Sequence, residues 1–171
     1  MAEKLTLTDL LEGEIKDLYS AEKQLTKAIP KMAKGSHDPM LSKAFTKHLK
    51  ETEEQVARLE EVGKLLDFKP SGKKCAGMEG LVSEGAEMLE EDGDDIVLDL
   101  GIIGAGTRVE HYEMAAYQTA ISLAERLGAK EVVNLLQRSY AEEQAADETL
   151  RKIANGLLRE APSATEFRAS S

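Results

Sequence analysis

The chain has 171 residues, of which 32 are acidic and 22 basic, so its formal net charge is −10 at neutral pH. This acidic balance argues against binding to nucleic acid or to anionic membrane surfaces, because both need a cationic protein surface. With 32% charged and only 4% aromatic residues, the composition is typical of a helix-rich protein, and the length is that of one domain. We therefore expect a single all-α domain.

The first helix is predicted to begin near Thr6 or Thr8, because either side chain can cap a helix N-terminus. Apolar and small residues then recur with helical spacing as far as about Ile29. Pro30 follows directly, and we expect it to kink or end the helix.

A turn is predicted over residues 35–39, followed by a second long helix over about 39–66. A polar segment, 67–74, separates this helix from a short amphipathic helix over 78–90. The chain therefore contains a long connection after its first helical hairpin.

Two further long helices are predicted, over about 94–127 and 130–158, with Gly128 as the C-cap between them. Residues 1–158 would form the domain, and 159–171 a flexible C-terminal tail. Two antiparallel hairpins joined by a long crossover with a short helix form the ferritin-like four-helix bundle, in contrast to bundles with only short loops.

The sequence also favours a cytoplasmic protein. Cys75 is the one cysteine, so no disulfide can form within the chain. The first residues lack the apolar core of a signal peptide. The longest apolar run, 96–106, contains Asp99 and is too short to cross a bilayer.

Each of the four long helices carries acidic residues near its middle, within or beside its apolar stripe. The candidate metal ligands are these acids together with His48. In helix order they are Glu14 and Asp17, His48 and Glu51, Glu110 and Glu113, and Glu143 and Asp147. Burying ionised carboxylates is costly unless they are paired, neutralised or bound to metal. A pair of Fe or Mn ions, two per chain, is the natural compensating charge in such a bundle.

The pattern departs from the usual carboxylate centre, which takes a Glu-x-x-His pair from each of two helices. This chain has no Glu-x-x-His; it offers His48 and Glu51 in the reverse order, and Ala146 stands where the last helix would need histidine. Acids at the edge of an apolar stripe also occur in bundles without metal, paired with lysine or arginine. Both interpretations remain open from the residues alone.

Five sequence blocks resemble the YciE/YciF family of ferritin-like bacterial stress proteins. They are DLYSAEKQLTKAIPKM (17–32), AFTKHLKETEEQVARLEEV (44–62), AGMEGLVSEG (76–85), VEHYEMAAYQTAISLAERLG (109–128) and AEEQAADETL (141–150). The resemblance implies a rubrerythrin-like bundle that forms homodimers, holds a di-metal centre and takes part in stress responses. It also implies Glu22 as an alternative to Glu14 or Asp17 for the ligand from the first helix.

Two functions follow as hypotheses. In the first, a di-metal carboxylate centre reacts with peroxide or dioxygen or sequesters iron, with Glu110 and Glu143 as chelating or bridging ligands and His48 and Glu51 completing one side. In the second, the protein is a non-enzymatic, dimeric protective protein whose polar core is closed by hydrogen bonds without metal. The sequence leaves open whether any reaction is catalysed.

Overall fold

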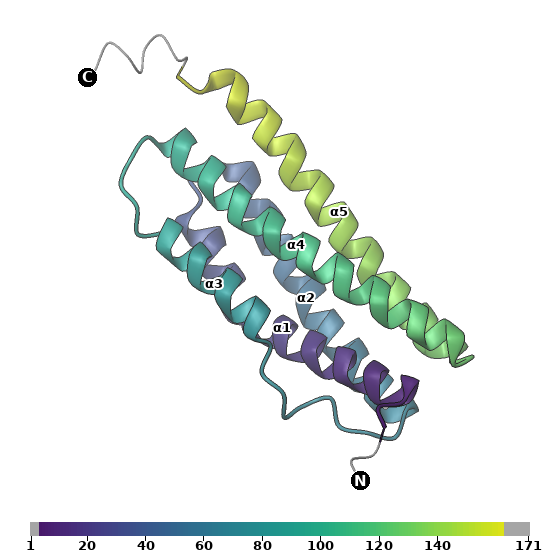
Figure 1. Ribbon diagram of the computed structural model, residues 1–171. Helices are drawn as coiled ribbons and strands as arrows, with labels where there is room; N and C mark the ends of the chain where they lie inside the picture. The colour runs from purple at the N-terminus through teal and green to yellow at the C-terminus, as the bar shows by residue number, and fades with distance from the viewer. Residues whose placement is uncertain (1–3, 163–171) are drawn as a thin grey trace.

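The computed structural model describes residues 4–162, and within this range the regular elements are five α-helices (Figure 1). Their bounds are α1 Leu7–Gly35, α2 Pro39–Leu65, α3 Ala76–Met88, α4 Asp95–Arg126 and α5 Lys130–Glu160. The predicted all-α class is thus confirmed. Of the predicted tail, the first residues extend α5, and 163–171 lie outside the described residues.

The four long helices form a bundle in which α1 packs on α2 and α4, and α5 packs on α4 and α2. Short turns join α1 to α2 and α4 to α5, whereas residues 66–94 cross from one hairpin to the other. The crossover carries α3, which lies against α1 and α4 on one side of the bundle (Figure 1). This is the ferritin-like topology that the connection lengths predict.

Side-chain caps set the starts of α1, α2 and α4. Thr6 accepts a hydrogen bond from the Asp9 amide at 3.1 Å, and the Asp9 carboxylate accepts one from the Thr6 amide at 2.8 Å. Asp38 and Asp94 cap α2 and α4 in the same way. These caps satisfy amide groups that have no partner within the helix.

Of the two effects expected of Pro30, the end of the first helix is wrong, since α1 continues to Gly35. Proline removes one backbone hydrogen bond from the helix. Ile29 and Met32, on either side of it, are both buried in the core, so tertiary packing holds this last part of α1 in place.

The apolar core consists of two clusters at opposite ends of the bundle. One includes Leu11, Ile15, Leu18, Leu59, Val62, Tyr117, Ala120, Ala124, Val132 and Leu136. The other includes Leu25, Ile29, Met32, Leu41, Phe45, Met78, Ile102, Ile103, Leu150 and Leu157. In each long helix, buried polar side chains lie between the two clusters.

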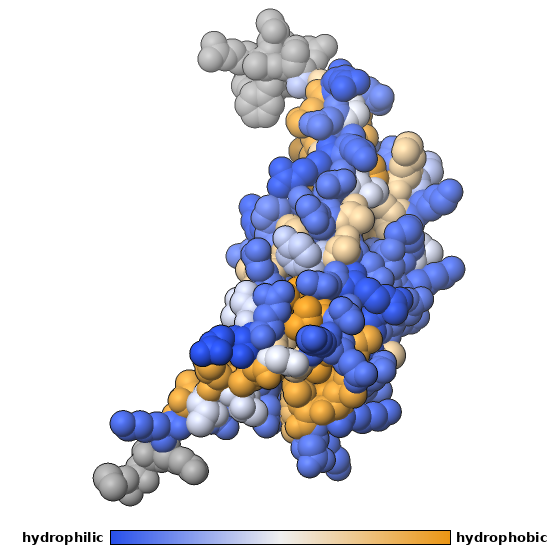
Figure 2. All heavy atoms as spheres, turned by 90° about the vertical axis from the view of Figure 1, so that its right-hand side faces the viewer, coloured by the Kyte–Doolittle hydropathy of each residue, from blue (hydrophilic) through white to orange (hydrophobic). Residues whose placement is uncertain are grey.

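Most of the surface facing the viewer in Figure 2 is hydrophilic, with hydrophobic atoms gathered toward the end of the bundle where α1 begins. Exposed leucines at this end are Leu5, Leu7, Leu10, Leu65 and Leu127. Among the described residues, no helix is both long and apolar enough to cross a membrane.

Asp99 of α4 fixes the turn between α1 and α2. Its buried carboxylate accepts hydrogen bonds from the amides of His37, at 2.9 Å, and Asp38, at 2.6 Å. A charged acceptor that satisfies two backbone donors across a helix contact ties the first hairpin to the second.

We expect Asp99→Ala to lower the free energy of unfolding by about 2–4 kcal/mol, because it leaves two amides without their acceptor. Asp95→Ala is the matched control, since Asp95 is largely exposed and contacts only the His37 ring, at 3.4 Å. Urea denaturation followed by circular dichroism measures both. Equal losses in the two variants would contradict the assigned role of Asp99.

Candidate metal centre

A layer of buried acidic side chains lies between the two apolar clusters. It comprises Glu22 of α1, Glu110 and Glu113 of α4, and Glu143 of α5, with His48 of α2 as the one basic group. Each of these side chains is at most 5% exposed. All four long helices therefore contribute to one polar site at the middle of the bundle.

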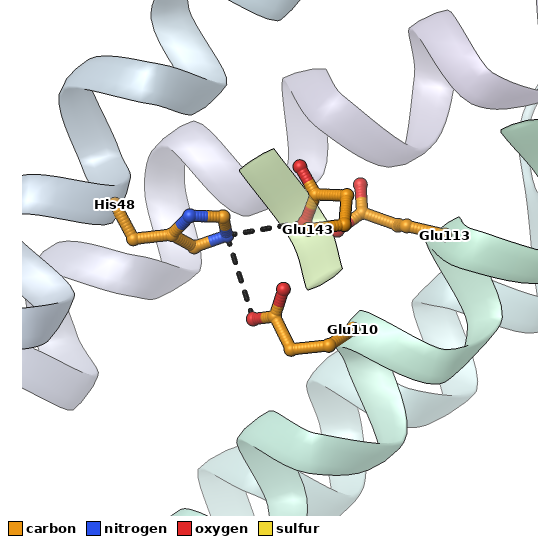
Figure 3. Close-up of side chains that lie close together, drawn as sticks. All are labelled: His48, Glu110, Glu113 and Glu143. Atoms are coloured by element: carbon orange, nitrogen blue, oxygen red, sulfur yellow. Dashed lines mark ion pairs between the residues drawn. The ribbon is translucent and has the colours of Figure 1, made fainter. Parts of the chain in front are cut away.

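The four residues drawn in Figure 3 point toward one another from α2, α4 and α5. The Nε2 atom of His48 lies 3.4 Å from a carboxylate oxygen of Glu110 and 3.4 Å from one of Glu143. One ligand atom from each of these three residues and from Glu113 lies within 4.8 Å of all the others. This spacing allows a single cation to contact several of them.

Most polar atoms of the layer lack a hydrogen-bond partner among the described residues. The atoms concerned are Glu22 Oε2, His48 Nε2, Glu110 Oε2, both carboxylate oxygens of Glu113 and Glu143 Oε2. Buried polar groups are ordinarily satisfied, and each exception requires an explanation. A cluster of unsatisfied oxygens with one imidazole nitrogen is the donor set that Fe or Mn binds, so the residues fit a metal centre.

The electrostatics of the layer are unfavourable without a cation. Burial raises the pKa of Glu22, Glu110 and Glu113 well above the ordinary range, and repulsion among these carboxylates and Glu143 raises it further. Burial, the largest single effect, would lower the pKa of His48, but the carboxylates of Glu143 and Glu51 together outweigh it, so that the pKa is raised. Without a bound cation, protons retained on these carboxyl groups therefore offset part of the negative charge of the layer.

Neighbouring polar groups orient several of these side chains. The Tyr117 hydroxyl donates to Glu22, and the Gln55 amide donates to Glu143. Glu51 places a carboxylate oxygen 3.4 Å from His48 Nδ1, which leaves Nε2 directed at the acidic layer. A carboxylate behind a histidine is the usual arrangement for holding the ring of a metal ligand.

Arg58 lies at the edge of the layer rather than inside it. Its guanidinium donates two hydrogen bonds to Glu142, at 2.6 and 2.7 Å, and one to Ser139 at 3.0 Å. The Arg58 guanidinium is therefore paired with Glu142 and does not neutralise the buried carboxylates.

On α1, the three predicted alternatives have different environments. Glu22 is fully buried in the acidic layer, whereas Glu14 is only half-buried. The inward position next to Glu14 is taken by Ile15, whereas Leu11 and Leu18 of the same stripe are buried. Asp17 accepts a hydrogen bond from the Tyr112 hydroxyl at 2.7 Å. Of the three, the structure brings only Glu22 to the other candidates.

On α2 and α5, two of the predicted residues lie beside the layer. Glu51 is half-buried and also pairs with Lys47. Asp147 is bound by Arg151 at 2.7 Å and by the His111 ring at 3.1 Å. The negative charge of Asp147 is thus already paired at the surface of the bundle.

The sequence of α4 contains a Glu-x-x-Glu pair, which the Glu-x-x-His motif does not describe. Glu110 and Glu113 are three residues apart, so both reach the same face of α4. This Glu-x-x-Glu pair takes the place of one Glu-x-x-His, and the centre is correspondingly richer in oxygen.

A pocket of about 350 Å³, its open mouth included, reaches the layer from solvent between α2 and α5 and is lined by both apolar and polar side chains. Its lining includes Lys47, Glu51, His48, Glu110 and Ala146. Ala146, at the position where histidine would be needed, leaves room for this opening.

We expect the metal-free protein to lose stability as pH rises above the ordinary glutamate pKa of 4.5, by about 1 kcal/mol per pH unit for each affected group. In the unfolded chain such a group titrates near its ordinary pKa of 4.5. The folded protein keeps the proton to higher pH, so the stabilisation is complete below the unfolded pKa and is lost as pH rises through the folded pKa.

Urea unfolding in a chelating buffer measures this dependence. Glu113→Gln should flatten the pH profile, whereas the exposed Glu53→Gln should leave it unchanged. A wild-type profile that rises over the same interval would contradict the raised pKa values.

Comparisons with known proteins agree with this architecture. The crystal structure of the stress protein YciF from Escherichia coli matches with a TM-score of 0.89 and 38% identity, covering 92% of this chain and 100% of that one. YcfI from Rhodopseudomonas palustris matches with a TM-score of 0.83 and 43% identity, covering 86% of this chain and 94% of that one. A Xanthomonas campestris protein, at 20% identity and a TM-score of 0.72, shares the fold.

The sequence comparisons identify the family. Protein YciF of Escherichia coli is 40% identical over 150 residues, which cover 87% of this chain and 90% of YciF. The family model described as a domain of unknown function, DUF892, matches residues 6–162. The resemblance seen in the sequence is thereby confirmed, and the chain belongs to the DUF892 family, which it shares with the stress protein YciF.

Proposed function

We propose that this protein is a stress-associated, ferritin-like metal protein that binds two Fe or Mn ions in the acidic layer. The observation that carries the proposal is the set of buried carboxylate oxygens without hydrogen-bond partners around His48 Nε2. Four carboxylates and one imidazole match the charge and ligand preference of two such divalent ions. Its relative YciF is described as a stress protein, which supports the association with stress.

Glu22, His48, Glu110, Glu113 and Glu143 would hold the ions. A bound pair would supply redox chemistry toward peroxide or dioxygen, or would serve to sequester iron. The apolar clusters enclose the layer on two sides, and the pocket between α2 and α5 leaves an approach from solvent.

The groups behind the ligands act through orientation. Tyr117 fixes Glu22, and Gln55 fixes one oxygen of Glu143 while the other oxygen stays free. Glu51 holds the imidazole of His48 from the Nδ1 side. Side chains held in this way lose little conformational entropy when a cation binds.

The second candidate is a metal-free protective protein, and the raised pKa values of Glu110 and Glu113 favour it. Protonated carboxyl groups can donate hydrogen bonds to neighbouring carboxylates and so close a polar core without a cation. A homodimer, implied by the family resemblance, is compatible with both functions and stays a prediction.

Metal analysis separates the two candidates. Untagged protein loaded anaerobically with Fe(II) or Mn(II) and then desalted should contain about two ions per chain. We expect Glu113→Ala and Glu143→Ala to retain less than half of the wild-type metal, measured by plasma mass spectrometry.

Asp147→Asn is the matched control because Asp147 is acidic, close to the layer and already bound by Arg151. It should keep the wild-type metal content, and circular dichroism should show that every variant is folded. Wild-type protein that takes up no metal on loading would refute the di-metal centre and favour the metal-free protective protein.

We also expect Glu51→Gln to weaken metal binding by about 10- to 100-fold without abolishing it, as is usual when the partner behind a ligating histidine is altered. Competition with a fluorescent chelator measures the affinity. Glu54→Gln, an exposed acid on the same helix, is the control. Complete loss of binding in Glu51→Gln would instead make Glu51 a direct ligand.

A further inference from the structure

The acidic layer has imidazole nitrogen on one side only. The Nε2 atom of His48 lies 3.4 Å from Glu110 and 3.4 Å from Glu143, as the dashed lines in Figure 3 show. Among the described residues, the His48 ring forms no ion pair with Glu22 or Glu113. Glu22 Oε2 and both carboxylate oxygens of Glu113 nevertheless lack hydrogen-bond partners among these residues. The other side of the layer therefore offers oxygen ligands alone.

Two neutral side chains of α2, Thr52 and Gln55, follow His48 on the same face of the helix. The spacings of four and three residues bring all three side chains to this face, and Thr52 and Gln55 are completely buried. The Gln55 amide donates to one oxygen of Glu143, and His48 Nε2 approaches the other oxygen. Thr52, between these two residues on the helix, therefore lies beside Glu143 as well.

Thr52 and Gln55 each have a buried oxygen atom, Oγ1 and Oε1, without a hydrogen-bond partner among the described residues. A threonine hydroxyl within a helix commonly bonds to the carbonyl group of the preceding turn. The exposed Thr46, Thr119 and Thr149 all do so, at 2.8–3.0 Å. Thr52 does not, although burial makes an unpaired hydroxyl most costly there. Its hydroxyl, like the Gln55 carbonyl oxygen, remains available for a ligand.

We propose that Thr52 Oγ1 and Gln55 Oε1 are ligands of an imidazole-free cation position on this side of the layer. Three buried glutamates complete the position, namely Glu22, Glu113 and Glu143. The donors are all oxygen, which is the set that hard divalent cations such as Mn²⁺ and Mg²⁺ prefer. The position at His48 adds an imidazole nitrogen, which suits Fe²⁺ and Zn²⁺. The two ions of the centre would thus occupy unlike positions.

Glu143 is suited to serve both positions, because its two oxygens face different neighbours. One oxygen contacts Gln55, and the other lies 3.4 Å from His48 Nε2. The two neutral ligands also limit the negative charge that the imidazole-free position accumulates. A cation bound there would be compensated by the three carboxylates without a further acid from α2.

This inference adds ligands to the proposed metal centre and rests on that proposal, but the two can fail separately. Protein that takes up no cation refutes the metal centre itself. Protein that takes up two cations and holds them in like surroundings refutes only the assignment of Thr52 and Gln55.

The test uses one cation of each preference. Metal-free protein receives one equivalent of Zn²⁺, then one equivalent of Mn²⁺, and is desalted; we expect about one ion of each kind per chain. Pulsed electron paramagnetic resonance then identifies the Mn²⁺ ligands, because a coordinated imidazole adds nitrogen modulation to the spin echo. We expect no imidazole modulation. Its presence, or retention of Zn²⁺ without Mn²⁺, would overturn the proposal.

Thr52→Val removes the hydroxyl and keeps the shape of the side chain. We expect it to weaken Mn²⁺ binding to the Zn²⁺-loaded protein by about tenfold, the loss of roughly one polar contact. Gln55→Leu should weaken binding further, since it also releases Glu143. Thr119→Val is the matched control, because the exposed Thr119 hydroxyl is bonded to the Ala115 carbonyl. The spectrum of free Mn²⁺ measures the affinity, and wild-type affinity in both α2 variants would exclude these ligands.

The metal-free protein gives a second readout. Thr52→Val removes a buried hydroxyl that has no partner, so it should raise the urea concentration at the midpoint of unfolding. Thr119→Val should not raise it. A hydroxyl that merely supports the fold would show the reverse behaviour, with a lower midpoint and unchanged Mn²⁺ affinity in Thr52→Val. That combination would overturn the proposal.

Discussion

The structure depends on one electrostatic constraint, which is the burial of Glu22, Glu110, Glu113 and Glu143 around a single imidazole. Each ionised carboxylate loses its hydration and gains only partial compensation from neighbouring donors. The bundle can contain this layer because burial of the apolar clusters on both sides stabilises the folded state. A site of this cost, built from all four long helices, is difficult to explain as packing alone.

The arrangement of positive charge supports this interpretation. A bundle could neutralise its acids by directing an arginine or lysine into the layer. Here Arg58 pairs with Glu142 at the edge, Arg151 pairs with Asp147, and Lys47 pairs with Glu51. The basic groups thus neutralise the acids around the centre, and the innermost carboxylates are left for protons or for a cation.

The sequence was sufficient for the fold but only in part for the site. Capping residues and helical periodicity determined the long helices to within a few residues, and Pro30 misled because packing of Ile29 and Met32 outweighs a local rule. A shift of one residue placed Glu14 on the inner face in place of Ile15. Asp17 could not be judged from the sequence, because its partners Cys75 and Tyr112 are 58 and 95 residues away.

The crossover helix makes the two sides of the centre chemically different. α3 packs against α1 and α4 and covers one side of the bundle. With α3 in place, one approach to His48 and Glu110 is apolar, while the other, between α2 and α5, is lined by Lys47 and Glu51. Phe45 lines both pockets and lies at their boundary. A connection that the topology needs merely to join two hairpins thereby also gives the two sides of the acidic layer different surroundings.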